Sequence, residues 1–484
     1  CQGNQEVVTT YSGATFKNCL IKDVNGEDAA VEMYYGNAVF IDCELTNNTA
    51  GYSGGDGLGA AVRVGNEWSE GGSTVHFYRS KLVNNTITTT SATYIHGGAI
   101  GINGSNDNNV KLVNSVVAGN LVSYNNTDTG LPPSGGGIYL NGGALLLINC
   151  TLVDNQISTY ADNLSDGGSA IRAIQNWNNF DSEPPQLTIF NSIIHGNSIV
   201  TNAGGASSTT TNINQIFMQD WGDGVEAYAS YSIIGGENNI EGDEILNLEP
   251  EFLDSTYALH PRSPAIGAGA VQSEDAEGNT IYAPTVDIAG NIRPNPADDD
   301  EYEDREAVPD LGAWESELAV TPYPDAPTNI FTIEDHQSVQ LFWDASDAED
   351  VVEYKIYFSA DSITFSLADS VSGRYNTEGS VSGLTNEEYY WFYVTSVDSN
   401  NYESSASMQQ KAKPHFQGPK WYVDTDNGSV NGEGSPAEPM RDIQDGIDAA
   451  STGDTVLVLP GRYDRNDDQN LIFEHISDSS PKNI

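Results

Sequence analysis

This sequence has few basic residues and no long apolar run. Its 484 residues include 19 Lys and Arg against 69 Asp and Glu, which gives a formal net charge of −50. A surface this negative repels phosphate groups, so we expect neither nucleic acid nor an anionic membrane as a partner. No apolar stretch approaches the roughly 20 residues of a membrane-spanning helix, so we expect no direct membrane span.

The motifs of common enzyme classes are also missing. The histidines His76, His96 and His195 are scattered, with no zinc-binding spacing. No Gly-x-Ser-x-Gly elbow, phosphate loop or dinucleotide fingerprint stands in a supporting context. The four cysteines do not make a disulfide framework. Any chemistry would therefore depend on residues that the fold brings together.

Seven segments follow one template. An apolar residue is followed three positions later by Cys or Ser, two further on by an aliphatic residue and, in most copies, three further on by Asn. The small residues are Cys19, Cys43, Ser80, Ser115, Cys150, Ser192 and Ser232, and the asparagines are Asn48, Asn85, Asn120, Asn155 and Asn197. Constant short segments with variable insertions indicate the stacked coils of a solenoid.

Each unit is typical of strands. Segments such as Val110–Asn114 are short and rich in β-branched residues, and a second strand follows a Gly run in each gap, as in Gly97–Ile100. This pattern predicts a right-handed parallel β-helix with coils about 4.8 Å apart, so that like residues stack. We expect the apolar column to fill the bore and the Cys/Ser column to occupy a corner. The Asn column would pass amide hydrogen bonds between coils while tolerating left-handed turn geometry.

The repeats resemble those of chlamydial polymorphic outer-membrane proteins and related bacterial surface β-helices, over about residues 11–260. The following segments Ser263–Gly269, Asp287–Arg293 and Asp310–Glu315 are similar to the closing region of secreted bacterial β-helix proteins. The resemblance implies a β-helix domain over residues 1–319, closed from about residue 261 by a cap over its open end.

Residues 320–414 resemble a fibronectin type III domain. Trp343 matches the core tryptophan of that family, and Leu384 with Tyr390 matches its leucine and tyrosine-corner pattern. Residues 415–484 resemble the start of a second β-helix module. In them Pro439 would begin a capping helix with Ile443, Ile447 and Ala450 on one face, followed by the strand in Gly453–Gly461. We therefore predict an all-β chain that is a segment of a longer polypeptide.

Many β-helices are polysaccharide lyases, and a lyase site on this fold would need an outward polar column. The best follows the Gly runs, with Arg63, Tyr139 and Arg172 aligned across four coils and Gly101 between the first two. A Tyr/Arg pair could act on an acidic sugar. The alternative is two solvated arginines and an exposed tyrosine, and the negative charge of the chain disfavours a polyanionic substrate.

Two further sets of candidates lie in loops. Exposed aromatic rings in the insertions could stack on sugars: Trp68, Tyr124, Tyr160, Trp177 and Trp221. Two acidic loops could bind Ca²⁺ as a cofactor: Asp298, Asp299 and Asp300 in one, Asp424 and Asp426 in the other. Flank-covering aromatics and solvated turns are the respective alternatives.

These features predict a non-enzymatic extracellular or bacterial cell-surface protein. It would act as an adhesin, stalk or glycan-binding scaffold, with glycans or other cell-surface proteins as partners. The alternative is a polysaccharide lyase, glycoside hydrolase or other carbohydrate-active β-helix enzyme. Self-assembly is a third possibility that the sequence does not separate from adhesion.

Overall fold

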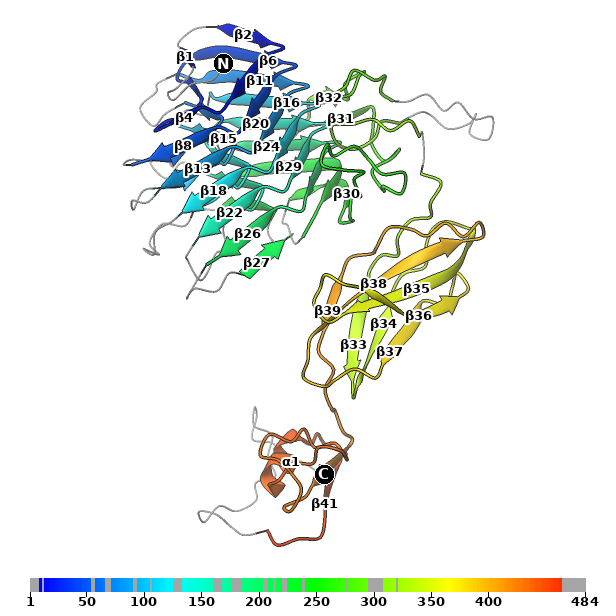
Figure 1. Ribbon diagram of the computed structural model, residues 1–484. Coiled ribbons are helices and arrows are strands. Elements are labelled where there is room, and N and C mark those ends of the chain that lie inside the picture. The colour runs from blue at the N-terminus through cyan, green and yellow to red at the C-terminus, as the bar shows by residue number, and fades with distance from the viewer. Residues whose placement is uncertain are drawn as a thin grey trace. The chain divides into compact units, whose positions relative to one another are not determined.

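The computed structural model forms two compact units, Cys1–Tyr323 and Pro324–Ile484, which are described separately (Figure 1). The structure describes residues 8–10, 13–53, 57–65, 71–89, 94–104, 107–124, 133–159, 168–175, 184–202, 208–211, 215–219, 224–236, 240–275, 277–294, 308–318 and 321–463. Strands dominate both units, as predicted.

Parallel strands stacked coil upon coil build the first unit. One coil runs through β5 (Val31–Met33), β6 (Gly36–Ile41), β7 (Glu44–Thr46) and β8 (Thr49–Tyr52), and the next coil pairs with it in parallel register. The predicted columns therefore coincide in space: Phe16 pairs with Phe40, and Phe40 with Phe77. The unit is a parallel β-helix.

Three long sheets result. Sheet A has seven strands: β1 (Val8–Thr10), β5, β10 (Val62–Val64), β15 (Ile100–Asn103), β19 (Ile138–Asn141), β23 (Ile171–Ile174) and β28 (Ile216–Gln219). Sheet C also has seven: β4 (Asn25–Gly26), β8, β13 (Thr86–Thr89), β18 (Leu121–Tyr124), β22 (Gln156–Thr159), β26 (Ser198–Thr201) and the antiparallel β27 (Ser208–Thr211). A separate two-stranded sheet pairs β9 (Gly57–Leu58) with β14 (Ile95–His96), and these strands precede β10 and β15 in the sequence.

Sheet B has fourteen strands and bends at the Cys/Ser corner. One limb contains β2 (Ala14–Lys17), β6, β11 (Ser73–Tyr78), β16 (Asn109–Val113), β20 (Ala144–Ile148) and β24 (Gln186–Phe190). The other contains β3 (Leu20–Lys22), β7, β12 (Lys81–Val83), β17 (Val116–Ala118), β21 (Thr151–Val153) and β25 (Ile193–His195). The long β29 (Glu226–Ile234) pairs with both limbs, and β30 (Glu241–Leu246) pairs with β29.

The bore is filled by the inward residue of each strand, because side chains alternate across a strand. Phe16, Phe40 and Phe77 stack with ring centroids 4.6 and 4.7 Å apart, and aliphatic residues continue the column. A second, smaller core beside sheet C contains Ile87, Ile157 and other apolar residues. The predicted use of the apolar column is confirmed.

Left-handed backbone makes the corners. The residue before each small residue has positive φ, as in Asn114 (49°) and Asn149 (49°). So does the residue before each ladder Asn, as in Asn47 (54°) and Asn84 (56°). The ladder asparagines were expected to tolerate left-handed geometry, but the residue before each of them has the positive φ. Their side chains point into the interior, so the preceding residue makes the turn.

The closing segment differs from the expected cap. Its apolar residues Leu259, Ile266 and Leu311 pack along the side of sheet B, against outward residues that include Val153 and Ile193. Its hairpin, β31 (Gln272–Glu274) and β32 (Thr280–Tyr282), adds Ile281 against Phe190 and its neighbours. Because these outward columns are apolar, the side of the solenoid needs covering as well as its end.

The second unit begins with a β-sandwich. One sheet contains β33 (Phe331–Asp335), β34 (Ser338–Phe342) and β37 (Glu378–Ser382), and the other β36 (Ser366–Ser372), β35 (Val351–Ser359), β38 (Tyr390–Asp398) and β39 (Gln410–Ala412). The predicted core Trp343 packs edge-on against Tyr354, with centroids 5.4 Å apart. The Tyr390 hydroxyl accepts the Thr385 N–H at 3.1 Å, which makes the tyrosine corner. This is a fibronectin type III fold.

The last described part, to residue 463, pairs β40 (Lys420–Val423) in parallel with β41 (Thr455–Val458). Helix α1 (Ile443–Ala449) connects them and begins after its N-cap Asp442, later than the predicted start at Pro439. Ile447 is buried on the predicted face, and Ala450, also buried, follows the helix.

Candidate functional site

The predicted polar column exists on the outer face of sheet A. Strand register pairs Arg63 with Gly101, Gly101 with Tyr139, and Tyr139 with Arg172. The residues on either side of each, such as Val62 and Val64, fill the bore, so the column faces outward. A Cβ at Gly101 would lie 2.7 Å from the Gly59 nitrogen, so no side chain fits between Arg63 and Tyr139.

Arg63 interacts with the buried Glu32 and not with Tyr139. Its Nη1 lies 4.0 Å from the Glu32 Oε1, on the preceding coil. The other Glu32 oxygen accepts the Tyr34 hydroxyl at 2.6 Å, and Glu32 is only 3% exposed. Burial, followed by the bond to Glu32, raises the pKa of Tyr34. The charge of Arg63 thus compensates a buried carboxylate.

Tyr139 and Arg172 are also engaged by neighbours. The ring of Tyr139, 5% exposed, stacks on His96 at 4.3 Å. The Arg172 guanidinium lies 5.6 Å from the centroid of the Phe217 ring on the next coil. Burial lowers the pKa of His96 to about 3, and its Nδ1 bonds the Ser134 hydroxyl at 2.7 Å. A general base needs a pKa near the working pH, so neutral His96 is a packing group here.

The asparagine ladder is the most continuous polar feature of the solenoid. Each Nδ2 donates to the Oδ1 on the next coil, at 2.9, 2.9, 2.8 and 2.8 Å from Asn48 to Asn197. Gln215 Oε1 accepts the last amide at 2.7 Å. At the other end Asn48 Oδ1 accepts the backbone N–H of Val24 at 3.1 Å. The ladder predicted from sequence is confirmed, and both of its ends are satisfied.

The small-residue column forms a second ladder at the corner. Backbone N–H groups of Cys43, Ser80 and Ser192 donate to the hydroxyl on the next coil at 3.2, 3.2 and 3.0 Å. Among the cysteines that the structure describes, Cys19, Cys43 and Cys150 carry free thiols, as expected for corner residues.

The remaining candidates receive less structural support. Tyr124 lies at the end of β18 and is 2% exposed in the core beside sheet C, so it offers no face to a sugar. The other predicted aromatics lie outside the described residues: Trp68, Tyr160, Trp177 and Trp221.

The calcium candidates divide in the same way. Asp298, Asp299 and Asp300 lie outside the described residues. Asp424 uses its carboxylate in its own turn, accepting the N–H groups of Asp426 and Asn427 at 2.9 and 3.1 Å. The Asn427 side-chain amide, then these two backbone bonds, lower the pKa of Asp424. No group of three or more His, Cys, Asp or Glu able to hold a metal ion occurs in the described parts, and calcium binding stays a prediction.

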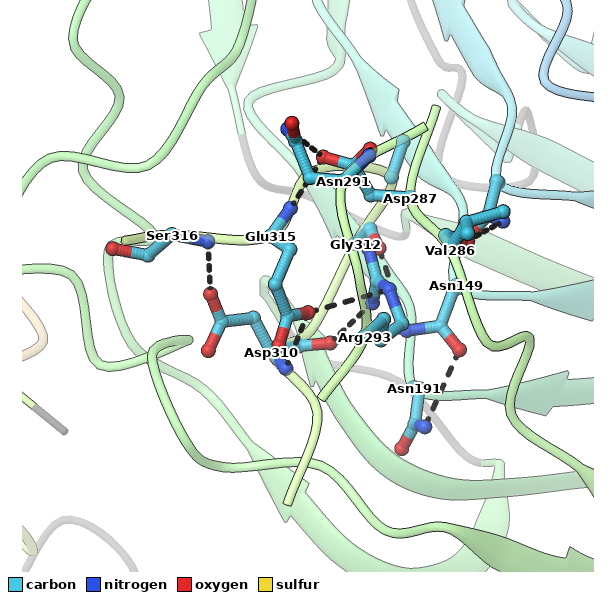
Figure 2. Close-up of polar contacts among 12 residues, drawn as sticks. Asn149, Asn191, Val286, Asp287, Asn291, Arg293, Asp310, Gly312, Glu315 and Ser316 are labelled. Atoms are coloured by element: carbon cyan, nitrogen blue, oxygen red, sulfur yellow. Dashed lines mark hydrogen bonds and ion pairs between the residues drawn. The ribbon is translucent and has the colours of Figure 1, made fainter. Parts of the chain in front are cut away.

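A buried network that the sequence did not assign fastens the closing segment to the solenoid (Figure 2). The fully buried side chain of Arg293 lies 3.3 Å from Glu315 and donates to the carbonyls of Asp310 and Gly312 at 2.8 and 3.1 Å. The Asn149 amide donates to the same Asp310 carbonyl at 3.0 Å. Burial, and then the charge of Glu315, raises the pKa of the Asp310 carboxyl to about 8. The motifs Asp287–Arg293 and Asp310–Glu315 were visible in the sequence, but their contacts were not.

A cleft between the end of sheet B and the β31–β32 hairpin was also missed. It has a volume of about 300 Å³ and is lined by Tyr228, Tyr231, Asp243, Gln272, Ser273, Glu274 and Thr280. The Tyr228 hydroxyl donates to Asp243 at 2.7 Å. No periodic signal marks these residues, because they come from the last coils and the hairpin.

No helix in the described parts of the chain is both long and apolar enough to cross a membrane. No family model and no curated protein matches the chain. Among solved structures, it is similar to an Fn3-like protein from Clostridium thermocellum, at 20% identity over 18% of this chain and 90% of that chain, with a TM-score of 0.16. It is also similar to the fn3 domain of human collagen alpha-1(XX) chain, at 17% identity over 22% and 93%, with a TM-score of 0.18. A beta-1,2-glucanase from Parabacteroides distasonis matches at 21% identity over 22% and 15%, with a TM-score of 0.17.

Proposed function

We propose that this chain belongs to a non-enzymatic extracellular protein of a bacterium, which acts as an adhesin, stalk or glycan-binding scaffold. The observation that carries this proposal is that the outward side chains of sheet A contact neighbouring protein groups. Arg63 faces Glu32, Tyr139 stacks on His96, and Arg172 lies over Phe217. The three side chains that were the best candidates for a reactive site therefore take part in packing and in charge compensation.

The internal ladders suit a scaffold. Amide hydrogen bonds connect successive coils from Asn48 to Gln215 without a break, and buried, satisfied networks stiffen a structure. A stiff rod followed by a fibronectin type III module is an arrangement that holds a binding surface away from its attachment point.

Charge and resemblance support the location and the partners. A net charge of −50 is relieved by counter-ions in salty water outside a cell. The similarity of the repeats to those of chlamydial polymorphic outer-membrane proteins supports a place on the cell surface, with glycans or cell-surface proteins as partners. Calcium at Asp424 and Asp426 belongs to the same proposal and is tested with it.

A polysaccharide lyase is the second candidate, on one observation. Tyr139 and Arg172 occupy facing positions on neighbouring strands, as a base and a carboxylate-binding group would in a lyase. The low exposure of Tyr139 argues against access by a polymer.

One experiment separates the two candidates. The full chain is passed over immobilised neutral and acidic polysaccharides, with and without millimolar Ca²⁺, and the eluate is monitored for the absorbance of unsaturated sugars. We expect retention without unsaturated products. Products that disappear in Arg172→Ala, while an Arg262→Ala control keeps them, would establish the lyase instead.

A further inference from the structure

The cleft beside the β31–β32 hairpin has fixed walls. Ser230 on β29 and Ser273 on β31 share a hydroxyl–hydroxyl bond of 2.8 Å. At the turn of the hairpin, Gln186 donates to Glu277 at 2.9 Å, and Ile281 is buried beneath. Parallel pairing of β29 with β30 brings Asp243 opposite Ser230. The three elements that line the cleft are therefore held together without a ligand.

The lining combines aromatic rings with hydrogen-bonding groups. Tyr228 and Tyr231 are half-buried, which leaves part of each ring accessible. Gln272 and Thr280, both exposed, each offer a donor and an acceptor. The Tyr228 hydroxyl donates to Asp243 at 2.7 Å, and this bond, then burial, raises the pKa of Tyr228 to about 12.

Charge restricts the ligand further. Asp243 and Glu274 are the charged residues of the lining, and none of the lining residues is basic. Phosphate, sulfate and uronate groups would meet two carboxylates with no compensating cation. The lining matches the chemistry of a neutral sugar, whose hydroxyls can donate to carboxylates and to the Gln272 carbonyl and whose C–H face can stack on a tyrosine ring.

We propose that this hairpin cleft binds one unit of a neutral, uncharged glycan, an inference that rests on the glycan-binding function proposed above. Its volume of about 300 Å³ lies at the lower end of the roughly 300–1,000 Å³ typical of ligand pockets, which suits a single sugar ring. Glycan specificity then comes from the end of the solenoid and not from the sheet A column.

The test is calorimetric titration of the full chain with neutral hexasaccharides of the glucan, xylan and mannan types. A hexagalacturonate and a hexalysine peptide serve as charged comparisons. The variants are Tyr228→Ala and Gln272→Ala. The matched control is Tyr282→Ala, because Tyr282 lies on the same hairpin, is 65% exposed and does not line the cleft. Circular dichroism and the unfolding midpoint show whether each variant keeps its fold.

We expect at least one neutral hexasaccharide to bind, with Kd raised about tenfold or more in Tyr228→Ala and Gln272→Ala and unchanged in Tyr282→Ala. Neutral glycan binding that none of the three variants alters would overturn the cleft and leave the proposed function standing. Binding of hexagalacturonate or hexalysine alone would overturn the ligand class. If no glycan binds at all, the glycan-binding function falls, and the cleft assignment with it.

Discussion

The asparagine ladder makes a quantitative prediction at Asn120, which is fully buried in the middle of the solenoid. Its Nδ2 donates to the Leu82 carbonyl at 2.9 Å and to Asn155 at 2.8 Å. Its Oδ1 accepts the backbone N–H and the side-chain amide of Asn85 at 3.0 and 2.9 Å. Asn120→Ala removes four hydrogen bonds at once.

The expected loss follows from these four bonds. Each buried hydrogen bond contributes about 1 kcal/mol net, so the free energy of unfolding should fall by about 4 kcal/mol. Asn120→Leu keeps most of the volume and loses the same bonds, so it should destabilise the first unit to a similar extent. If the cavity caused the effect, Leu would restore most of the stability.

The assay is calorimetry of the full chain together with urea unfolding followed by circular dichroism, which separates the transitions of the two units. The matched control is Asn37→Ala, because Asn37 lies on β6 with its side chain exposed. It should change stability by less than about 0.5 kcal/mol. Equal unfolding midpoints for Asn120→Ala and Asn37→Ala would refute the view that the ladder stabilises the solenoid.

Three further predictions concern single side chains. Arg293→Met removes one partner of a buried ion pair, which costs about 3–5 kcal/mol. Proteolysis within residues 250–318 should therefore be faster in this variant, whereas Arg262→Met, at a more exposed arginine, should leave the proteolysis rate unchanged. Equal proteolysis rates in the two variants would contradict this prediction. Burial lowers the pKa of His96 from 6.5 to about 3, so the unfolded chain binds the proton first as pH falls. Stability should decline below pH 6.5 by up to about 1.4 kcal/mol per pH unit, and a His96→Gln variant with an equally steep melting profile would argue against it. Tyr390→Phe should lower the stability of the fibronectin type III domain, measured by urea unfolding, by about 1 kcal/mol. Tyr389→Phe should leave that stability unchanged, because Tyr389 is 51% exposed. Equal effects of the two substitutions would rule out a stabilising tyrosine corner.

The solenoid could be predicted in detail because the repeat spacing in the sequence determines the register between coils. In a parallel in-register stack, equivalent positions of successive repeats are neighbours in space. Aligning Ser80 with Ser115 therefore also predicted that Asn85 would meet Asn120, and aligning Cys43 with Ser80 predicted that Phe40 would meet Phe77. The column of Arg63, Tyr139 and Arg172 was predicted on the same basis, and its register is as expected.

What the repeat did not encode could not be predicted. The contacts of the closing segment join residues far apart in the chain, such as Asn149 with Asp310, and no period relates them. The burial of Tyr139 also escaped prediction, because alternation along a strand indicates which face a residue is on but not what covers that face. The hairpin cleft was missed for both reasons.

The left-handed column before the small residues supplies three of the contacts that hold the closing segment. On two early coils this column holds Asp42 and Arg79, which satisfy each other through bonds of 2.7 and 3.0 Å. On three later coils it holds asparagines, and each donates its amide outward to a carbonyl of the closing segment: Asn114 to Val286, Asn149 to Asp310 and Asn191 to Ala270. Asn tolerates positive φ and still offers a side-chain donor to the closing segment, whereas Asp42 and Arg79 bond to each other. The Asn amides therefore anchor the closing segment on these three coils, whereas the coil of Arg79 contacts it through Lys81, whose Nζ lies 5.5 Å from the centroid of the Trp314 ring.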